Sequence, residues 1–308
     1  MSRIHEALQK ADQERAVHRS EKATTESANQ DASTPAHEDP PAPVNILSSP
    51  VVIHSKPETV PAVLKFDELR TRCARPRWHI DPNLVVFHDA GPSGLGTEQF
   101  RTLRSRLYRL RENLTIRTLL VTSAVPAEGK TFVATNLAQA IARQKDRRVL
   151  LIDADLRSPR IHTLLGAPST PGLAEYLQGE ANELDLIQCG GKEDLYFIPA
   201  GKQVTHASEL ILNGRLQKLL ERLAPLFDWV ILDSPPALPV ADASILAGLC
   251  EGVLLVVRAG RTPSITVQKA CQELQGTNIV GVALNGMEKV QDYGEYFTYG
   301  GYGEKDSK

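Results

Sequence analysis

The sequence has few aromatic residues, few cysteines and little net charge. Of its 308 residues, 5% are aromatic and four are cysteine, and the formal net charge is −2. The cysteines are widely spaced and form no CxxC pair, which argues against a disulfide framework or a thiolate zinc site and predicts four reduced thiols. A nearly neutral chain has no bulk electrostatic attraction for nucleic acid, so we expect no nucleic-acid partner. The four thiols are Cys73, Cys189, Cys250 and Cys271.

Long apolar runs are also lacking. No run of about 18 apolar residues, the length needed to span a bilayer, occurs anywhere in the chain. The first residues, MSRIHEALQKADQER, are charged and have no apolar signal core, so they do not predict a secretory leader. We therefore expect a cytoplasmic protein, unless a partner holds it elsewhere.

The first 65 residues predict two segments outside the folded domain. Residues 1–17 favour a short amphipathic helix, which is either a frayed helix without a partner or a docking segment for one. Residues 18–65 are rich in Ser, Thr, Ala, Glu and Pro and predict a disordered linker, because they cannot bury enough apolar surface. The helix has four apolar residues on one face: Ile4, Ala7, Leu8 and Ala11.

Residues 66–290 predict one α/β domain. An amphipathic helix at 97–113 is followed by six continuous apolar runs that alternate with helical stretches, which is typical of a parallel sheet with helices on both faces. Residues 291–308 have no apolar periodicity and predict a flexible tail. The six expected strands are 115–123, 148–155, 194–201, 228–235, 252–260 and 278–286.

The segment AVPAEGKTF, residues 124–132, lies between the first expected strand and a helix. Such a loop offers backbone N–H groups and a helix N-terminus to a phosphate. In this P-loop pattern Lys130 reaches the β- and γ-phosphates, Thr131 gives its hydroxyl to Mg²⁺, and Gly129 lets the backbone approach. The pattern is imperfect, because its usual first glycine is Ala124; the alternative is an ordinary turn with a surface lysine. We expect six residues to contact ATP: Ala127, Glu128, Gly129, Lys130, Thr131 and Phe132.

Three aspartates follow two other expected strands. Asp153 and Asp155 end one run, and Asp233 ends another. Ligands of open parallel sheets bind outside the carboxyl ends of the strands, so all three carboxylates should lie near Lys130. One aspartate after a strand is usually a cap or turn residue. Three beside a P-loop predict a Mg²⁺ site with one carboxylate left to act as a base.

Together these motifs resemble the bacterial tyrosine kinases of capsule and exopolysaccharide systems, the BY-kinases. The resemblance covers residues 80–302 and rests on PAEGKT, LLIDADLRSP, VILDSPP, EQFRTLR and a tyrosine-rich end. Members more often have PGEGK[ST], so Ala127 is a departure that bears on phosphate binding. The family implies a P-loop NTPase-like fold, ATP and Mg²⁺ as cofactors, and a separate membrane-bound activator that recruits the kinase to the inner face of the plasma membrane.

The resemblance also implies roles for single residues. Lys130 and Thr131 would bind ATP and Mg²⁺, and Asp153 would orient or deprotonate the acceptor tyrosine. Asp155 and Asp233 would hold Mg²⁺. Arg157, in the same loop, would neutralise the transferring phosphate. Apart from the resemblance, the position of Asn285 at the end of the last expected strand predicts that it lies near the adenine, although a turn-forming asparagine explains it nearly as well.

The EQFRTLR segment carries an ExxRxxR pattern formed by Glu98, Arg101 and Arg104. Residues three apart share one helix face, so these three make either a solvated surface with a weak ion pair or a contact between subunits. The family implies the contact, with copies of the kinase closing into a ring. A repeated heterologous interface produces a ring when its rotation closes.

The segment YGEYFTYGGYGE near the end of the chain holds four of the seven tyrosines. Its glycines favour flexibility, which an acceptor tyrosine needs in order to enter another active site. An incidental low-complexity tail is the alternative. The combined pattern predicts an ATP-dependent tyrosine autokinase that regulates exopolysaccharide synthesis or export. The expected phosphoacceptors are Tyr293, Tyr296, Tyr299 and Tyr302.

Two other functions fit the phosphate motif. One is a positioning ATPase of the partition or Min type, which shares this kind of P-loop. That class has a second lysine early in the loop, where this chain has Val125. The other is a non-catalytic subunit that binds nucleotide only to change shape, and the substitution at Ala127 keeps it open.

Overall fold

The computed structural model describes residues 64–80, 85–87, 94–190 and 194–287. The predicted helix at 1–17, nearly all of the predicted linker at 18–65 and the predicted tail at 291–308 lie outside these ranges. The four candidate acceptor tyrosines also lie outside them. Within the described ranges, the helices are all too short or too polar to cross a bilayer.

The described residues form a sheet of seven strands in the order β3-β4-β2-β5-β1-β6-β7. The six predicted parallel strands are confirmed, and β5 lies between β1 and β2 although it comes later in the chain. The short strand β3 was not predicted; it runs antiparallel to β4. The strands are β1 (Thr118–Ser123), β2 (Val149–Asp153), β3 (Gln188–Cys189), β4 (Leu195–Ile198), β5 (Trp229–Asp233), β6 (Gly252–Arg258) and β7 (Ile279–Asn285).

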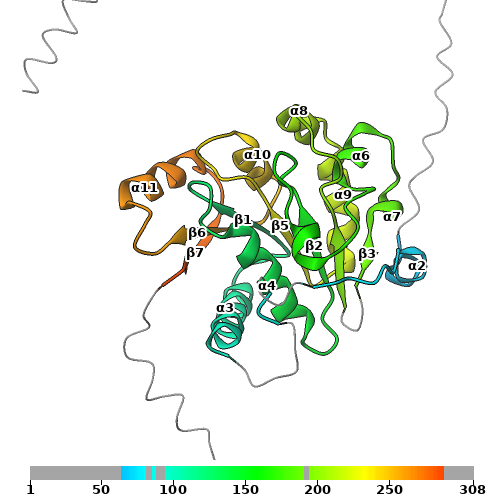
Figure 1. Cartoon of the computed structure of the whole chain (residues 1–308), viewed down its shortest axis with the longest axis horizontal. Coiled ribbons are helices and arrows are strands. Elements are labelled where there is room, and N and C mark those ends of the chain that lie inside the picture. The colour runs from blue at the N-terminus through cyan, green and yellow to red at the C-terminus, as the bar shows by residue number, and fades with distance from the viewer. Residues whose placement is uncertain (1–63, 81–84, 88–93, 191–193, 288–308) are drawn as a thin grey trace, which may run out of the picture. The chain divides into compact units, whose positions relative to one another are not determined.

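Helices cover both faces of this sheet (Figure 1). One face packs against α3 (Leu95–Arg111), α4 (Lys130–Ala142) and α5 (Ile161–Leu165). The helices on the other face are α2 (Phe66–Arg72), α6 (Leu173–Gln178), α7 (Glu183–Leu186), α8 (Ala207–Leu212), α9 (Arg215–Leu223), α10 (Asp242–Gly248) and α11 (Ser264–Glu273).

The strand sequences account for this three-layer arrangement. Successive residues of a strand point to opposite faces, and both faces here are covered, so every residue of β1, β2 and β5 is buried. In β1, Leu119 and Val121 join the core beneath α3 and α4, whereas Leu120 joins the core on the other face. The predicted apolar stripe of α3 is also present, with Phe100 and Leu107 buried.

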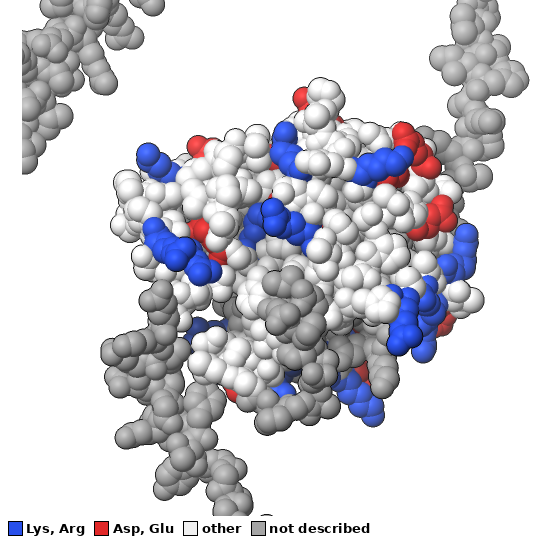
Figure 2. Space-filling model, viewed as in Figure 1, with Lys and Arg blue, Asp and Glu red and all other residues white. Residues whose placement is uncertain are grey.

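Charged side chains are scattered over the face of the molecule seen in Figure 2. Basic and acidic groups are interspersed there, and much of the visible surface is uncharged.

Candidate active site

The loop between β1 and α4 has the backbone shape of a phosphate cradle. Gly129, the residue just before α4, has φ +94°, and Ala127 has φ +67°. A Cβ at Gly129 would collide with Nδ2 of Asn285, so this position needs glycine for both its conformation and its space. Ala127 holds a left-handed conformation that costs a residue with a Cβ about 1–2 kcal/mol.

Glu128 organises this loop from inside the protein. Its buried carboxylate accepts hydrogen bonds from Val125 N at 2.8 Å, Arg258 N at 3.1 Å and Thr262 Oγ1 at 2.5 Å. The side chain therefore ties the loop to the end of β6 and cannot face a bound nucleotide. The expected contact of Glu128 with ATP stays a prediction, and only the backbone of this residue is free to make it.

Lys130 begins α4 and meets one of the predicted carboxylates. Its Nζ lies 2.9 Å from Asp155 Oδ2, and the two side chains are 14% and 5% exposed. Burial alone lowers the pKa of Lys130, but the carboxylates of Asp233 and Asp155 outweigh burial and raise it. The ammonium group is therefore protonated at neutral pH.

Asp153 and Asp233 are paired residues at the carboxyl ends of β2 and β5. The Asp153 carboxylate accepts backbone N–H groups of Asp155, Arg160 and Ile161 at 3.0–3.3 Å. Burial raises the pKa of both carboxyl groups. The negative charge of Asp233 raises the pKa of Asp153 further. Lys130 and Thr131 lower the pKa of Asp233 and so partly offset its burial.

Both oxygens of Asp233 are buried and make no hydrogen bond of ordinary geometry among the described residues, although Lys130 and Thr131 act on this carboxyl group and partly offset the effect of burial on its pKa. Such a carboxylate beside Thr131 offers the hard oxygen ligands that Mg²⁺ prefers. Within the same ranges, side chains alone form no group of three or more metal ligands. The residues fit Mg²⁺ that arrives with a nucleotide, because this ion is usually held by one or two carboxylates together with phosphate oxygens.

Arg157 lies in the same loop as Asp155, but its guanidinium is bound elsewhere. Nε donates to Asp242 Oδ2 at 2.6 Å, and Nη2 donates to Asp242 Oδ1 at 3.1 Å and to Ser208 Oγ at 3.2 Å. The structure therefore does not bring this guanidinium to Lys130. Sequence reasoning missed Asp242, whose position at the start of a helix resembles that of an ordinary capping residue.

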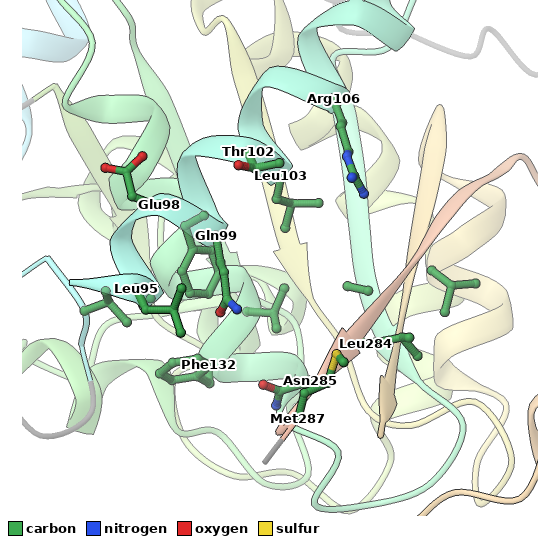
Figure 3. A pocket seen from close by; sticks show the side chains of 16 residues that line it. Leu95, Glu98, Gln99, Thr102, Leu103, Arg106, Phe132, Leu284, Asn285 and Met287 are labelled. Carbon is green, nitrogen blue, oxygen red and sulfur yellow. The ribbon is translucent and has the colours of Figure 1, made fainter. Parts of the chain in front are cut away.

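Asn285 lies beside the phosphate loop, at the end of β7. Its Nδ2 donates to the backbone oxygen of Glu128 at 2.8 Å. Asn285 and Phe132 also line a groove of about 520 Å³ between α3 and β7, whose rim carries the exposed side chains of Leu95 and Leu284 (Figure 3). The predicted proximity of Asn285 to the adenine and the predicted contact of Phe132 with ATP remain predictions.

The ExxRxxR residues do not act as one surface group. Glu98 and Arg101 form a partly exposed ion pair on α3. Arg104 instead points toward α4, where its Nη1 donates to the backbone oxygen of Ala140 at 2.5 Å. Sequence spacing placed all three on one face but did not indicate that Arg104 contributes to packing within the chain. Their predicted role between subunits stays a prediction.

Comparisons with known proteins agree on one family. Residues 126–262 match the family model described as "AAA domain". The tyrosine-protein kinase YwqD of Bacillus subtilis is 34% identical over 218 residues, which are 70% of this chain and 90% of that protein. The tyrosine-protein kinase etk of Escherichia coli K12 is 37% identical over 213 residues, but the chain spans only 29% of its length. The solved kinase domain of Escherichia coli ETK has 35% identity and a TM-score of 0.63, covering 73% of this chain and 91% of that domain.

Proposed function

The chain belongs to the bacterial tyrosine-protein kinases and is itself a protein-tyrosine kinase, and we propose that it phosphorylates its own C-terminal tyrosines with MgATP. One observation carries the proposal. A protonated Lys130, a phosphate cradle and a buried carboxylate at Asp233 that lacks a hydrogen bond of ordinary geometry lie together at the carboxyl ends of adjacent strands. Phosphoryl transfer needs mainly positioning and neutralisation of charge, which this set supplies.

Each residue has a distinct part in the proposed reaction. The loop N–H groups and the Lys130 ammonium bind and neutralise the phosphates of ATP. Thr131, Asp155 and Asp233 would hold Mg²⁺, which supplies further positive charge when bound. Asp153, with its raised pKa, is suited to accept a proton near neutral pH.

The proposed transfer conserves atoms and charge. The tyrosine oxygen forms a bond to the γ-phosphorus while the bond from that phosphorus to the bridging oxygen breaks, and ADP leaves. The phenolic proton passes to the carboxylate of Asp153. The three backbone N–H groups that bind this carboxylate hold it in one orientation during the transfer.

The acceptors in this proposal are the four tyrosines outside the described residues. Each phosphate adds a charge of about −1.5 to −2 at neutral pH, so four would add roughly −6 to −8. Such a charge repels neighbouring tails, and we infer that phosphorylation loosens a ring-like oligomer of this kinase. The resemblance to capsule-system kinases supports a role in exopolysaccharide synthesis or export under a membrane-bound activator.

The test is phosphopeptide mapping after incubation with ATP and Mg²⁺. Wild-type protein is expected to carry phosphate on Tyr293, Tyr296, Tyr299 or Tyr302, and Lys130→Met is expected to carry none. Lys145→Met, which removes an exposed lysine just beyond the end of α4, is the matched control and should behave as wild type. Phosphate that is absent from all four tyrosines, or that persists in Lys130→Met, contradicts the proposal. Released phosphate without phosphotyrosine indicates a positioning ATPase instead.

A further inference from the structure

The ion pair between Asp242 and Arg157 joins three segments at the edge of the candidate active site. Asp242 is the first residue of α10, and its side chain is 0% exposed. It accepts two hydrogen bonds from Arg157 of the loop after β2, and a third at 2.5 Å from Ser208 of α8. We call these three residues the Asp242 clasp.

The clasp uses most of the hydrogen-bonding capacity of Arg157. A guanidinium has five N–H groups. Arg157 makes two bonds to Asp242, one to Ser208 Oγ and one to the backbone oxygen of Thr205. Little capacity remains for a transferring phosphate, so Arg157 cannot be a phosphate ligand while the clasp is closed.

A buried carboxylate such as Asp242 is stable only when it is paired and hydrogen-bonded. Burial alone raises the pKa of Asp242, but the hydrogen bonds from Arg157 and Ser208 outweigh burial and lower it. The carboxylate is therefore ionised at neutral pH and binds the guanidinium with its full charge.

The loop held by the clasp carries Asp155. Gln203 Nε2 donates to the backbone oxygen of Arg157, and Val204 N donates to that of Leu156 at 3.2 Å, so the outer side of the loop is fixed. On its inner side, Asp155 accepts a hydrogen bond from Ser158 N at 3.0 Å through Oδ1 and from Lys130 through Oδ2. Arg157 is thus two residues from the carboxylate that meets the phosphate-binding lysine.

We propose that Asp242 is a positioning residue for phosphoryl transfer, which holds the loop after β2 through Arg157 and thereby places Asp155 against Lys130. The proposal rests on the proposed kinase function. It assigns Arg157 to the support of the site and removes it from contact with the transferred phosphate. Removing a supporting residue of this kind typically lowers activity about 10-fold to 100-fold.

The experiment is a double-mutant cycle on the full chain. Asp242→Asn, Arg157→Met and the double variant are compared for the kcat of tail phosphorylation and for ATP affinity without Mg²⁺. Because the two residues act through one contact, each single variant and the double variant should lose kcat by the same factor, about 10-fold or more. ATP affinity without Mg²⁺ should change by less than about twofold, since the phosphate cradle is intact.

Two further variants keep the test decisive. Arg147→Met breaks a more exposed ion pair with Asp228, at the opposite end of the strands, and should leave kcat unchanged. Ser208→Ala removes the hydrogen bond to Asp242 and the one accepted from Arg157, and should lower kcat about threefold even if Asp242→Asn folds poorly. Thermal unfolding of each variant shows that the folded protein is being compared.

Three results overturn the proposal. If Arg157→Met loses far more kcat than Asp242→Asn, Arg157 acts on the phosphate itself. If the two effects multiply in the double variant, the residues act independently. If folded Asp242→Asn and Ser208→Ala both retain wild-type kcat, the clasp has no role in the reaction. Failure of the kinase function itself appears differently, as wild-type protein that forms no phosphotyrosine.

Discussion

Gly129→Ala tests whether Asn285 and the phosphate loop are packed as closely as the structure has them. The new Cβ would meet Asn285 Nδ2, which must move and lose its bond to the Glu128 oxygen. That bond contributes about 0.5–1.5 kcal/mol. Alanine at φ +94° adds strain of about 1–2 kcal/mol, and the smaller entropy of the unfolded alanine chain offsets about 0.4–1 kcal/mol. We expect the free energy of unfolding to fall by about 2 kcal/mol.

The same substitution should cost less when Asn285 is already alanine. In the Asn285→Ala background the collision is absent and the hydrogen bond is already lost, so only the backbone strain and the entropy difference remain. The cost of Gly129→Ala should then drop to about 1 kcal/mol, a coupling of about 1 kcal/mol between the two positions. Urea unfolding followed by tryptophan fluorescence is a suitable assay, because Trp229 is fully buried in β5. Equal costs in the two backgrounds would refute the close approach.

Three other substitutions test the loop and the clasp. Ala127→Gly removes left-handed strain at φ +67° but gives the unfolded chain more entropy, so the free energy of unfolding should rise by no more than about 1 kcal/mol. Nucleotide affinity should not weaken. A clear loss of stability in urea unfolding would count against this strain. In Glu128→Gln the amide cannot accept hydrogen bonds from all three donors that the carboxylate binds, so the free energy of unfolding should fall by about 2 kcal/mol. A variant as stable as wild type would contradict this expectation. The lowered pKa of Asp242 contributes stability that is present above its unfolded pKa of about 3.9 and lost as pH falls through the lower folded value. The Tm difference between wild type and Asp242→Asn should accordingly shrink below about pH 4, and a difference that stays constant down to pH 2 would contradict this linkage.

The sequence was sufficient for the fold and for much of the site because both depend on rules that are local or topological. Continuous apolar runs indicated the buried parallel strands. Parallel strands have their carboxyl ends at one edge of the sheet, and this rule predicted that Asp153, Asp155 and Asp233 lie near Lys130. The strand β3 was missed because two residues, Gln188 and Cys189, carry no periodic signal.

Other features of the site depend on contacts between distant segments, which spacing does not reveal. The partner of Arg157 lies 85 positions away, and Glu128 meets Thr262 across 134 positions. Both side chains are charged and stand in phosphate-binding motifs, so sequence reasoning assigned them to the ligand. The structure instead bonds both side chains to other parts of the protein, Glu128 to the loop and the end of β6, and Arg157 to Asp242.

The place of β5 between β1 and β2 has a consequence for protein synthesis. The phosphate loop and the loop of Asp155 leave the ribosome well before Trp229–Asp233, yet the strand that separates and aligns them is made afterwards. A nascent chain that stops before residue 229 has both loops but no scaffold to hold them at the right spacing. Nucleotide binding by the growing polypeptide should therefore begin only once β5 has emerged, however early the glycine and lysine of the loop are translated.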